Sequence, residues 1–213
     1  MIVEESEIME RFEIFAENPD QRIIEEAVER INKGGLIVYP TDTVYGIGCS
    51  IHQKNAIEIL YRLKGKSKFE PMSLICSSIQ QASEFAKISN ATFRILKKCF
   101  PGPFTIVLEA KNGFAKLMLT RQKEIGIRIP DNYICQTLVS ALGQPLLNSS
   151  VPINENDGLY ENIEIAEEFS EQADLMLDVG PILDTGESSV IKIKENEIEI
   201  LREGKGDINQ IFS

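Results

Sequence analysis

The sequence has only one histidine, His52, and no tryptophan. A single histidine leaves few ligands for a zinc site of the Cys/His kind and little scope for a Ser-His-Asp triad. The residues around it, SIHQKN, are typical of an exposed turn, so we do not expect His52 to act as a catalytic base. Any chemistry must therefore come from other residue types.

Cysteines are also few and widely spaced. They lie in apolar stretches without the CxxC spacing of metal and redox sites, so we expect free thiols in a reducing cytoplasm. No apolar run approaches the roughly 20 residues that span a bilayer, and the first residues are acidic, unlike a signal peptide. We expect a cytoplasmic protein with no membrane partner. The four cysteines are Cys49, Cys76, Cys99 and Cys135.

Acidic residues outnumber basic ones, 33 to 22, which gives a formal net charge of -11. Such a surface repels polyanions as a whole, so a phosphate-bearing ligand must bind a local basic patch. The stretch YRLKGKSKF supplies Arg62, Lys64, Lys66 and Lys68 with no acidic residue among them. It is either a phosphate-binding patch or a solvated helix end whose cations suit the helix dipole, and the residues alone leave both open.

Apolar periodicity alternates along the chain between period 2 and period 3.6, without repeats or a linker. This alternation predicts a single α/β domain over residues 1–213, built on a twisted, open, mixed sheet flanked by helices. A final pair of alternating runs predicts an antiparallel hairpin over 188–204. The other expected strands are 12–17, 36–40, 72–78, 104–110, 124–130, 145–150 and 173–180, and the expected helices are 18–35, 55–65, 78–88, 90–100, 132–143 and 163–172.

Polar or glycine-rich stretches follow several of the apolar runs. Each stretch taken singly is typical of a turn, but together they supply hydroxyls, permissive backbone and lysines, which are what a nucleotide site needs. Neither GxxxxGK[ST] nor GxGxxG occurs, so a phosphate site must be assembled from separated segments. The stretches are YPTDTVYGIG (39–48), LKGKSKFEP (63–71), PGPFT (101–105) and NSSVP (148–152).

These stretches resemble the YrdC/YciO family, whose best-known members make threonylcarbamoyl-adenylate from L-threonine, bicarbonate and ATP for tRNA modification. The resemblance implies that family's fold with a deep, positively lined cavity, and an L-threonylcarbamoyladenylate synthase-like nucleotidyltransferase that uses ATP as substrate, with magnesium. It covers nearly the whole chain, in the family's order: GGLIVYPTDTVYGIGC, YRLKGKSKFEPMSLIC, FPGPFTIVLEA, IGIRIPDN, LGQPLLNSS, SSVIKI and ILREGKGD.

The resemblance also implies the site residues. Lys64, Lys66 and Arg202 would be catalytic, because attack on the α-phosphorus builds negative charge that they and magnesium neutralise without a covalent nucleophile. No protein side chain is expected to bind the metal. The implied substrate and nucleotide residues are Thr41, Thr43, Tyr45, Thr105, Arg128, Asn148, Ser150 and Ser189.

Departures from the synthase pattern, among them Lys66 and Pro152, point to the YciO branch. Lys66 stands where synthases have the arginine of Lys-x-Arg, and Pro152 stands where they have the asparagine of Ser-x-Asn. A lysine keeps the charge but loses the planar fork that suits phosphate. The alternative interpretation is therefore a YciO-type protein that binds double-stranded RNA or tRNA and has lost or altered the synthase activity. A nucleotide-dependent hydrolase or sensor is a third.

Overall fold

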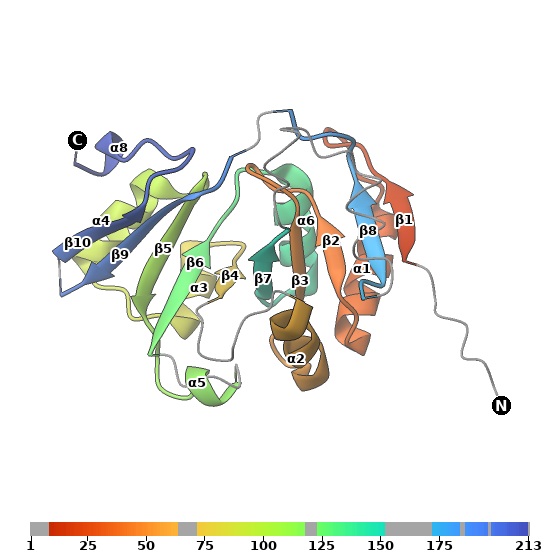
Figure 1. Ribbon diagram of the computed structural model, residues 1–213, viewed down its shortest axis with the longest axis horizontal. Coiled ribbons are helices and arrows are strands. Elements are labelled where there is room, and N and C mark those ends of the chain that lie inside the picture. The colour runs from red at the N-terminus through yellow and green to blue at the C-terminus, as the bar shows by residue number, and fades with distance from the viewer. Residues whose placement is uncertain are drawn as a thin grey trace.

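The computed structural model describes residues 9–63, 72–117, 123–151, 172–183, 186–195 and 197–212. These residues form one open ten-stranded mixed sheet flanked by helices, which confirms the expected fold class (Figure 1). The strands are β1 (Glu10–Glu13), β2 (Ile37–Tyr39), β3 (Gly46–Ser50), β4 (Ser73–Ile75), β5 (Phe104–Glu109), β6 (Glu124–Arg128), β7 (Leu146–Ser150), β8 (Leu175–Asp178), β9 (Ser189–Lys194) and β10 (Glu197–Arg202). The helices are α1 (Gln21–Lys33), α2 (Lys54–Leu63), α3 (Ile79–Phe85), α4 (Asn90–Cys99), α5 (Phe114–Leu117), α6 (Tyr133–Leu142) and α8 (Asn209–Phe212).

The sheet does not follow chain order. Its strands run β1-β8-β2-β3-β7-β4-β6-β5-β9-β10, from the right edge to the left edge of Figure 1. The pairs β1–β8, β2–β8, β4–β6 and β5–β9 are parallel, and the remaining neighbours are antiparallel. Antiparallel pairing is therefore more extensive than the hairpin alone, β9–β10, which is itself confirmed.

The sequence of helix α1 explains where the helix begins and ends and which face it buries. Its N-cap, Asp20, accepts a 2.9 Å hydrogen bond from the backbone N–H of Arg22, and it ends at Gly34, whose φ of 99° suits glycine. Ile24, Ala27 and Ile31 lie on one face and are buried. That face packs with α6 against one side of β1, β2 and β8.

The two faces of the sheet are covered differently, and the difference creates the site. One face packs along its length against α2, α3 and α4. The opposite face packs against α1 and α6 over β1, β8 and β2 and, at Leu146 and Ile75, over part of β7 and β4. Its other half, over β4, β5, β6 and β9, carries small and polar side chains such as Ser73, Thr105 and Gly126. Because strand residues alternate between faces, these small and polar side chains share one face of the sheet, which none of the described helices is seen to cover there.

Two strands differ from the sequence predictions, and one expected helix falls outside the comparison. The strand expected at 12–17 is β1 (Glu10–Glu13), and Phe15 beyond it is 77% exposed. Strand β3 was not predicted, because GIGCS reads as a glycine-rich loop. The helix expected at 163–172 lies almost wholly outside the described residues. Nowhere in the described ranges is a helix long and apolar enough to cross a membrane.

Candidate functional site

The candidate site is a pocket of about 280 Å³ over the part of the sheet face that carries these small and polar side chains. Alternate residues of the strands make its floor: Thr105 and Val107 on β5, and Gly126 and Arg128 on β6. A Cβ at Gly126 would lie 3.1 Å from Cγ2 of Thr105, so glycine keeps this floor deep. The described lining residues are Met72, Ser73, Thr105, Val107, Gly126, Arg128, Asn148, Ser149, Ser150, Glu187, Ser188, Val190 and Arg202.

Arg128 is the buried cation of this pocket, with a side chain only 3% exposed. Its Nη2 donates hydrogen bonds to Oδ1 of Asp42 (2.5 Å), Oγ1 of Thr43 (2.5 Å) and Oγ1 of Thr41 (3.2 Å). Its Nε is also buried, yet it has no hydrogen-bond partner among the described residues. An orphaned buried donor is costly and marks a place where a ligand acceptor would bind.

The side chains of Thr41–Thr43 bind the guanidinium of Arg128 but do not themselves line the pocket. Thr41 and Thr43 are 3% and 0% exposed, and neither is among the residues that line the pocket. Thr41 donates from its hydroxyl to the carbonyl of Val44 (2.5 Å) and accepts from the backbone N–H of Thr43 (3.1 Å). Both predicted residues are thus brought to the site, where their hydroxyls contact the arginine.

Asn148 lines the wall beside β3. Its Oδ1 accepts a 2.6 Å hydrogen bond from the hydroxyl of Tyr39, and its Nδ2 donates to Oγ of Ser73 (3.2 Å). Burial raises the pKa of Tyr39 well above its usual value, so the phenol keeps its proton and remains a donor. The bond fixes which way the amide of Asn148 faces.

The opposite wall joins β5 to the C-terminal hairpin. The hydroxyls of Thr105 and Ser188 lie 2.8 Å apart. Arg202 donates from Nε and Nη2 to the carbonyl of Ser188 (3.1 and 2.9 Å), and its Nη1 lies 2.7 Å from Oε1 of Glu187. This wall therefore pairs a cation with a carboxylate inside the pocket.

Ser189 is not among the described residues that line the pocket, whereas its neighbour Ser188 is. Its hydroxyl donates to the carbonyl of Gly206 (2.7 Å) and accepts from the backbone N–H of Gly204 (2.9 Å), which fastens the turn after β10. Ser188, one residue earlier, lines the pocket instead. Sequence reasoning missed Ser188, Glu187 and Ser73, although period-2 alternation along SSVIKI distinguishes the two serines once the buried face is known.

Tyr45 is also buried, but its hydroxyl is used elsewhere. It donates to the carbonyl of Gly180 (2.8 Å) and accepts from the backbone N–H of Val179 (3.0 Å), and Oδ1 of Asp178 lies 3.3 Å away. Burial raises its pKa above the usual range of a phenol. Tyr45 is not among the described lining residues, whereas the predicted Ser150 is. The predicted Lys64 and Lys66 lie outside the described residues.

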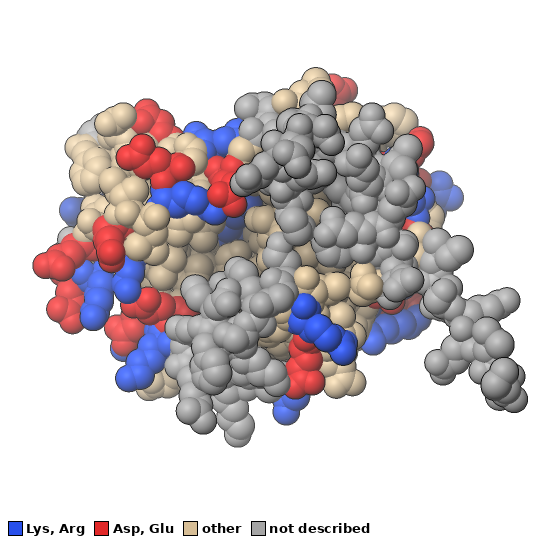
Figure 2. Space-filling model, in the orientation of Figure 1, with Lys and Arg blue, Asp and Glu red and all other residues tan. Residues whose placement is uncertain are grey.

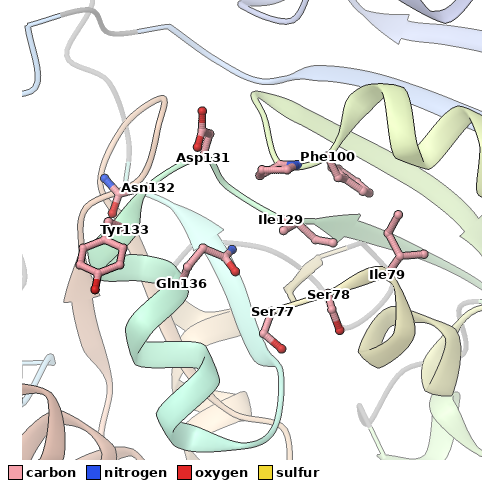
Figure 3. Close-up of a pocket in the computed structure, with 10 residues that line it drawn as sticks. Ser77, Ser78, Ile79, Phe100, Ile129, Asp131, Asn132, Tyr133 and Gln136 are labelled. Carbon is pink, nitrogen blue, oxygen red and sulfur yellow. The ribbon is translucent and has the colours of Figure 1, made fainter.

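A second pocket, of about 320 Å³, opens between α6 and the segment Ser77–Ile79. Figure 3 shows Gln136 reaching into this space from α6, above Ser77. Its Nε2 donates to the carbonyls of Cys76 (3.4 Å) and Pro130 (3.2 Å), so the amide is held by the protein. No lysine or arginine is found among the described residues that line it. The pocket that contains Arg128 is therefore the better anion site.

Residues 29–204 match the family model Sua5/YciO/YrdC, whose description is "Telomere recombination". The chain belongs to the Sua5/YciO/YrdC family. It is 35% identical to YciO of Escherichia coli strain K12, described as uncharacterized, over 92% of this chain and 96% of that protein. It is 28% identical to the threonylcarbamoyl-AMP synthase of Bos taurus, over 89% of this chain and 69% of that protein. The expected closeness to the YciO branch is confirmed.

Solved structures agree with this membership. The crystal structure of E. coli YciO superposes with a TM-score of 0.86 at 34% identity, covering 96% of this chain and 100% of that one. The structure of P. abyssi Sua5 complexed with L-threonine superposes with a TM-score of 0.83 at 25% identity, covering 94% of this chain and 59% of that one. The Sua5/YciO/YrdC fold thus extends over nearly all of this chain.

Basic and acidic residues lie next to one another on the described surface of this protein instead of forming separate patches. Figure 2 shows basic and acidic side chains next to one another over its coloured surface. Several form ion pairs, including Lys192 with Glu124 (2.7 Å) and Arg202 with Glu187. Within the described ranges, no group of three His, Cys, Asp or Glu side chains is placed to hold a metal. The expected deep, positively lined cavity is not demonstrated by these residues, which form a pocket of mixed charge.

Proposed function

We propose that the protein is a nucleotidyltransferase of the threonylcarbamoyl-AMP synthase type, which converts L-threonine, bicarbonate and ATP to threonylcarbamoyl-AMP and diphosphate. The observation that carries the proposal is the buried guanidinium of Arg128, which has an unpartnered Nε and belongs to a residue that lines a pocket with hydroxyl and amide groups. A carboxylate accepts well from such a donor. The similarity to a Sua5 structure complexed with L-threonine supports an amino acid as the carboxylate ligand.

The reaction needs positioning and charge neutralisation more than a covalent nucleophile. The threonine amine attacks the carbon of bicarbonate, which yields a carbamate and releases water. A carbamate oxygen then attacks the α-phosphorus of ATP, and the bond to diphosphate breaks. Arg128 would hold the amino-acid carboxylate, while Arg202 and the lysines Lys64 and Lys66 would neutralise the phosphate oxygens.

Magnesium fits this proposal as a partner of the nucleotide. Mg²⁺ bound to ATP keeps several waters and takes most of its remaining ligands from phosphate oxygens, so a dedicated cage of side chains is not required. Glu187 is the carboxylate that lines the pocket within the described ranges. When bound, the ion would supply positive charge at the phosphates.

The decisive experiment is to incubate the protein with ATP, L-threonine and bicarbonate and to measure diphosphate release and threonylcarbamoyl-AMP by mass spectrometry. We expect the adenylate only when all three substrates are present, and none with Arg128→Lys, which keeps the charge but loses the fork. Adenylate absent from the wild-type reaction, together with no binding of ATP or threonine by calorimetry, would exclude the synthase.

The lysine-rich stretch provides two further tests. Lys64→Ala should weaken ATP binding without loss of stability, because a solvated cation contributes little to folding. Lys66→Arg should raise synthase activity, because it restores the bidentate fork.

Structured RNA or tRNA is the competing ligand. The net charge of -11 weighs against it, and RNA binding that collapses with salt while ATP binds tightly would favour the enzyme.

A further inference from the structure

We propose that Asp42 is the positioning residue of this site: it holds the guanidinium of Arg128 so that the Nε edge is presented to a ligand carboxylate. The carboxylate Oδ1 of Asp42 lies 2.5 Å from Nη2 of Arg128, and both side chains are nearly buried, at 9% and 3% exposure. The inference rests on the proposed function, since it concerns how the amino-acid substrate is recognised.

The division of hydrogen bonds supports an orienting role. A guanidinium has five N–H donors in a rigid plane, so fixing one nitrogen fixes the direction of the others. The hydrogen bonds of Arg128 to Asp42, Thr41 and Thr43 all go through Nη2. Nε is left buried and without a partner in the described part of the chain. Because Nη2 and the Nε–H lie on the same edge of the planar guanidinium, the acceptors that hold Nη2 also determine where the free Nε–H points.

Among these three acceptors only Asp42 carries charge. The threonine hydroxyls are neutral, and each is also within hydrogen-bond distance of the other, at 3.1 Å. A buried guanidinium without a counter-charge is strongly destabilised, so the threonines by themselves would not hold Arg128 buried in this orientation. Asp42 does both tasks, because its carboxylate neutralises the cation and determines its direction.

Asp42 is in turn held by two distant segments. Its Oδ2 accepts from the backbone N–H of Asp131 (3.0 Å), at the connection between β6 and α6. Its carbonyl oxygen accepts from Nζ of Lys205 (2.9 Å), which follows β10. The two segments thus hold the carboxylate and the backbone of the residue that binds Arg128. Hydrogen bonds of this kind keep a binding group close to the position and angle that ligand recognition requires.

Two other roles for Asp42 predict different effects on binding. If Asp42 only neutralises Arg128, Asp42→Asn should strengthen carboxylate binding, because the cation becomes free to attract the ligand. If Asp42 only stabilises the fold, the folded variant should bind as the wild type does. A positioning role predicts weaker binding, because the guanidinium of Arg128 is no longer held in one orientation for the ligand.

The experiment compares calorimetric binding of L-threonine and L-threoninamide, which lacks the carboxylate. The wild type should prefer threonine, and Asp42→Asn should reduce that preference about tenfold, the effect expected for losing one charge-assisted hydrogen bond. Asp20→Asn is the matched control, because it removes the exposed Asp20–Arg22 pair (3.2 Å) and keeps a good N-cap. An unchanged or increased preference in Asp42→Asn overturns the proposal.

A second variant covers the case in which Asp42→Asn does not fold. Asp42→Glu keeps the charge but moves the carboxylate by one methylene, so its preference for threonine should lie between those of the wild type and Arg128→Lys. A wild-type preference in Asp42→Glu would show that charge suffices and position does not matter, which also overturns the proposal.

An NMR measurement separates this inference from the proposed function. The Nε–H resonance of Arg128 is assigned as the one lost in Arg128→Lys, and it should be sharp and slow to exchange in the wild type and in Asp20→Asn. In Asp42→Asn or Asp42→Glu it should broaden or shift. If threonine does not bind the wild type, the proposed function fails while this resonance still reports on Asp42. Identical resonances in wild type and both Asp42 variants would refute the positioning role.

Discussion

The hydroxyl of Tyr39 donates a 2.6 Å hydrogen bond to Oδ1 of Asn148 and so joins β2 to the pocket wall across the intervening strand β3. The tyrosine ring passes over β3 where that strand carries Gly46 and Gly48. A Cβ at Gly46 would lie 2.6 Å from Oδ1 of Asn148, and one at Gly48 would lie 3.1 Å from Cε1 of Tyr39. The glycines after TDTVY are therefore required by this crossing.

Tyr39→Phe should lower the free energy of unfolding by about 1–3 kcal/mol, because Oδ1 of Asn148 is left buried without its donor. It should also weaken ligand binding, since the amide of Asn148 is no longer held. Urea unfolding and calorimetry measure the two effects. Tyr133→Phe is the control, because Tyr133 is 63% exposed. Equal stability of Tyr39→Phe and wild type would contradict the role of this bond.

Gly48→Ala and Gly126→Ala should have opposite consequences. At Gly48 the added Cβ would lie 2.9 Å from the backbone oxygen of Leu147, which cannot move aside, so we expect a loss of about 1–3 kcal/mol. At Gly126 the nearest atom belongs to the side chain of Thr105, 3.1 Å away, and the residue forms the pocket floor. Gly126→Ala should keep more stability and lose more ligand affinity. The reverse order in urea unfolding and calorimetry would be inconsistent with this packing.

Glu187→Gln should tighten ATP binding by about two- to fivefold, a gain that corresponds to the value of a half-exposed charge contact. The carboxylate of Glu187 lines the pocket, repels phosphate and occupies Nη1 of Arg202. Glu109→Gln is the control, because Glu109 forms an exposed ion pair with Lys87 and is not a lining residue. Calorimetry that finds weaker ATP binding in Glu187→Gln would show that the carboxylate helps the nucleotide, for example through its magnesium.

The buried thiols predict a loss of stability at high pH. Burial raises the pKa of Cys49 to about 12 from an ordinary value of 9.0. Between these values the unfolded chain has lost the thiol proton and the folded chain has kept it, so the free energy of unfolding falls as the pH rises. Each such thiol contributes about 1.4 kcal/mol per pH unit in this window. Cys76 and Cys135 behave alike, and the pKa of Cys99 rises to about 11.

Urea unfolding from pH 8 to pH 10.5 tests this expectation. Cys49→Ala should show a shallower decline above pH 9 than the wild type, although it is less stable at neutral pH. The free thiols should also react slowly with thiol reagents at pH 8, since all four are buried. Identical slopes in the two proteins would mean that Cys49 ionises normally in the folded state.

Local sequence patterns were sufficient to predict some elements of this structure and insufficient to predict others. Helix α1 could be predicted because its cap, its apolar face and its terminal glycine agree. Strand β3 could not, because the glycines that allow Tyr39 to cross it also remove the apolar alternation of a strand. The structure brings Arg128, Thr105 and Arg202, which the resemblance named, into one pocket. Thr43 faces Arg128 through a hydrogen bond between two residues that are 85 positions apart in the sequence. No local sequence pattern could have predicted that contact.

The sheet order has a consequence for synthesis of the chain. Strand β8, at Leu175–Asp178, is the partner of both β1 and β2, and Lys205 completes the support of Asp42. Until the ribosome has made these late residues, the N-terminal strands lack the neighbour that covers their edges. Unpaired edges attract other chains, and pairing across so many residues is slow. We therefore expect the nascent chain to depend on chaperones until its last third has been made, and the ligand site to be among the last features to form.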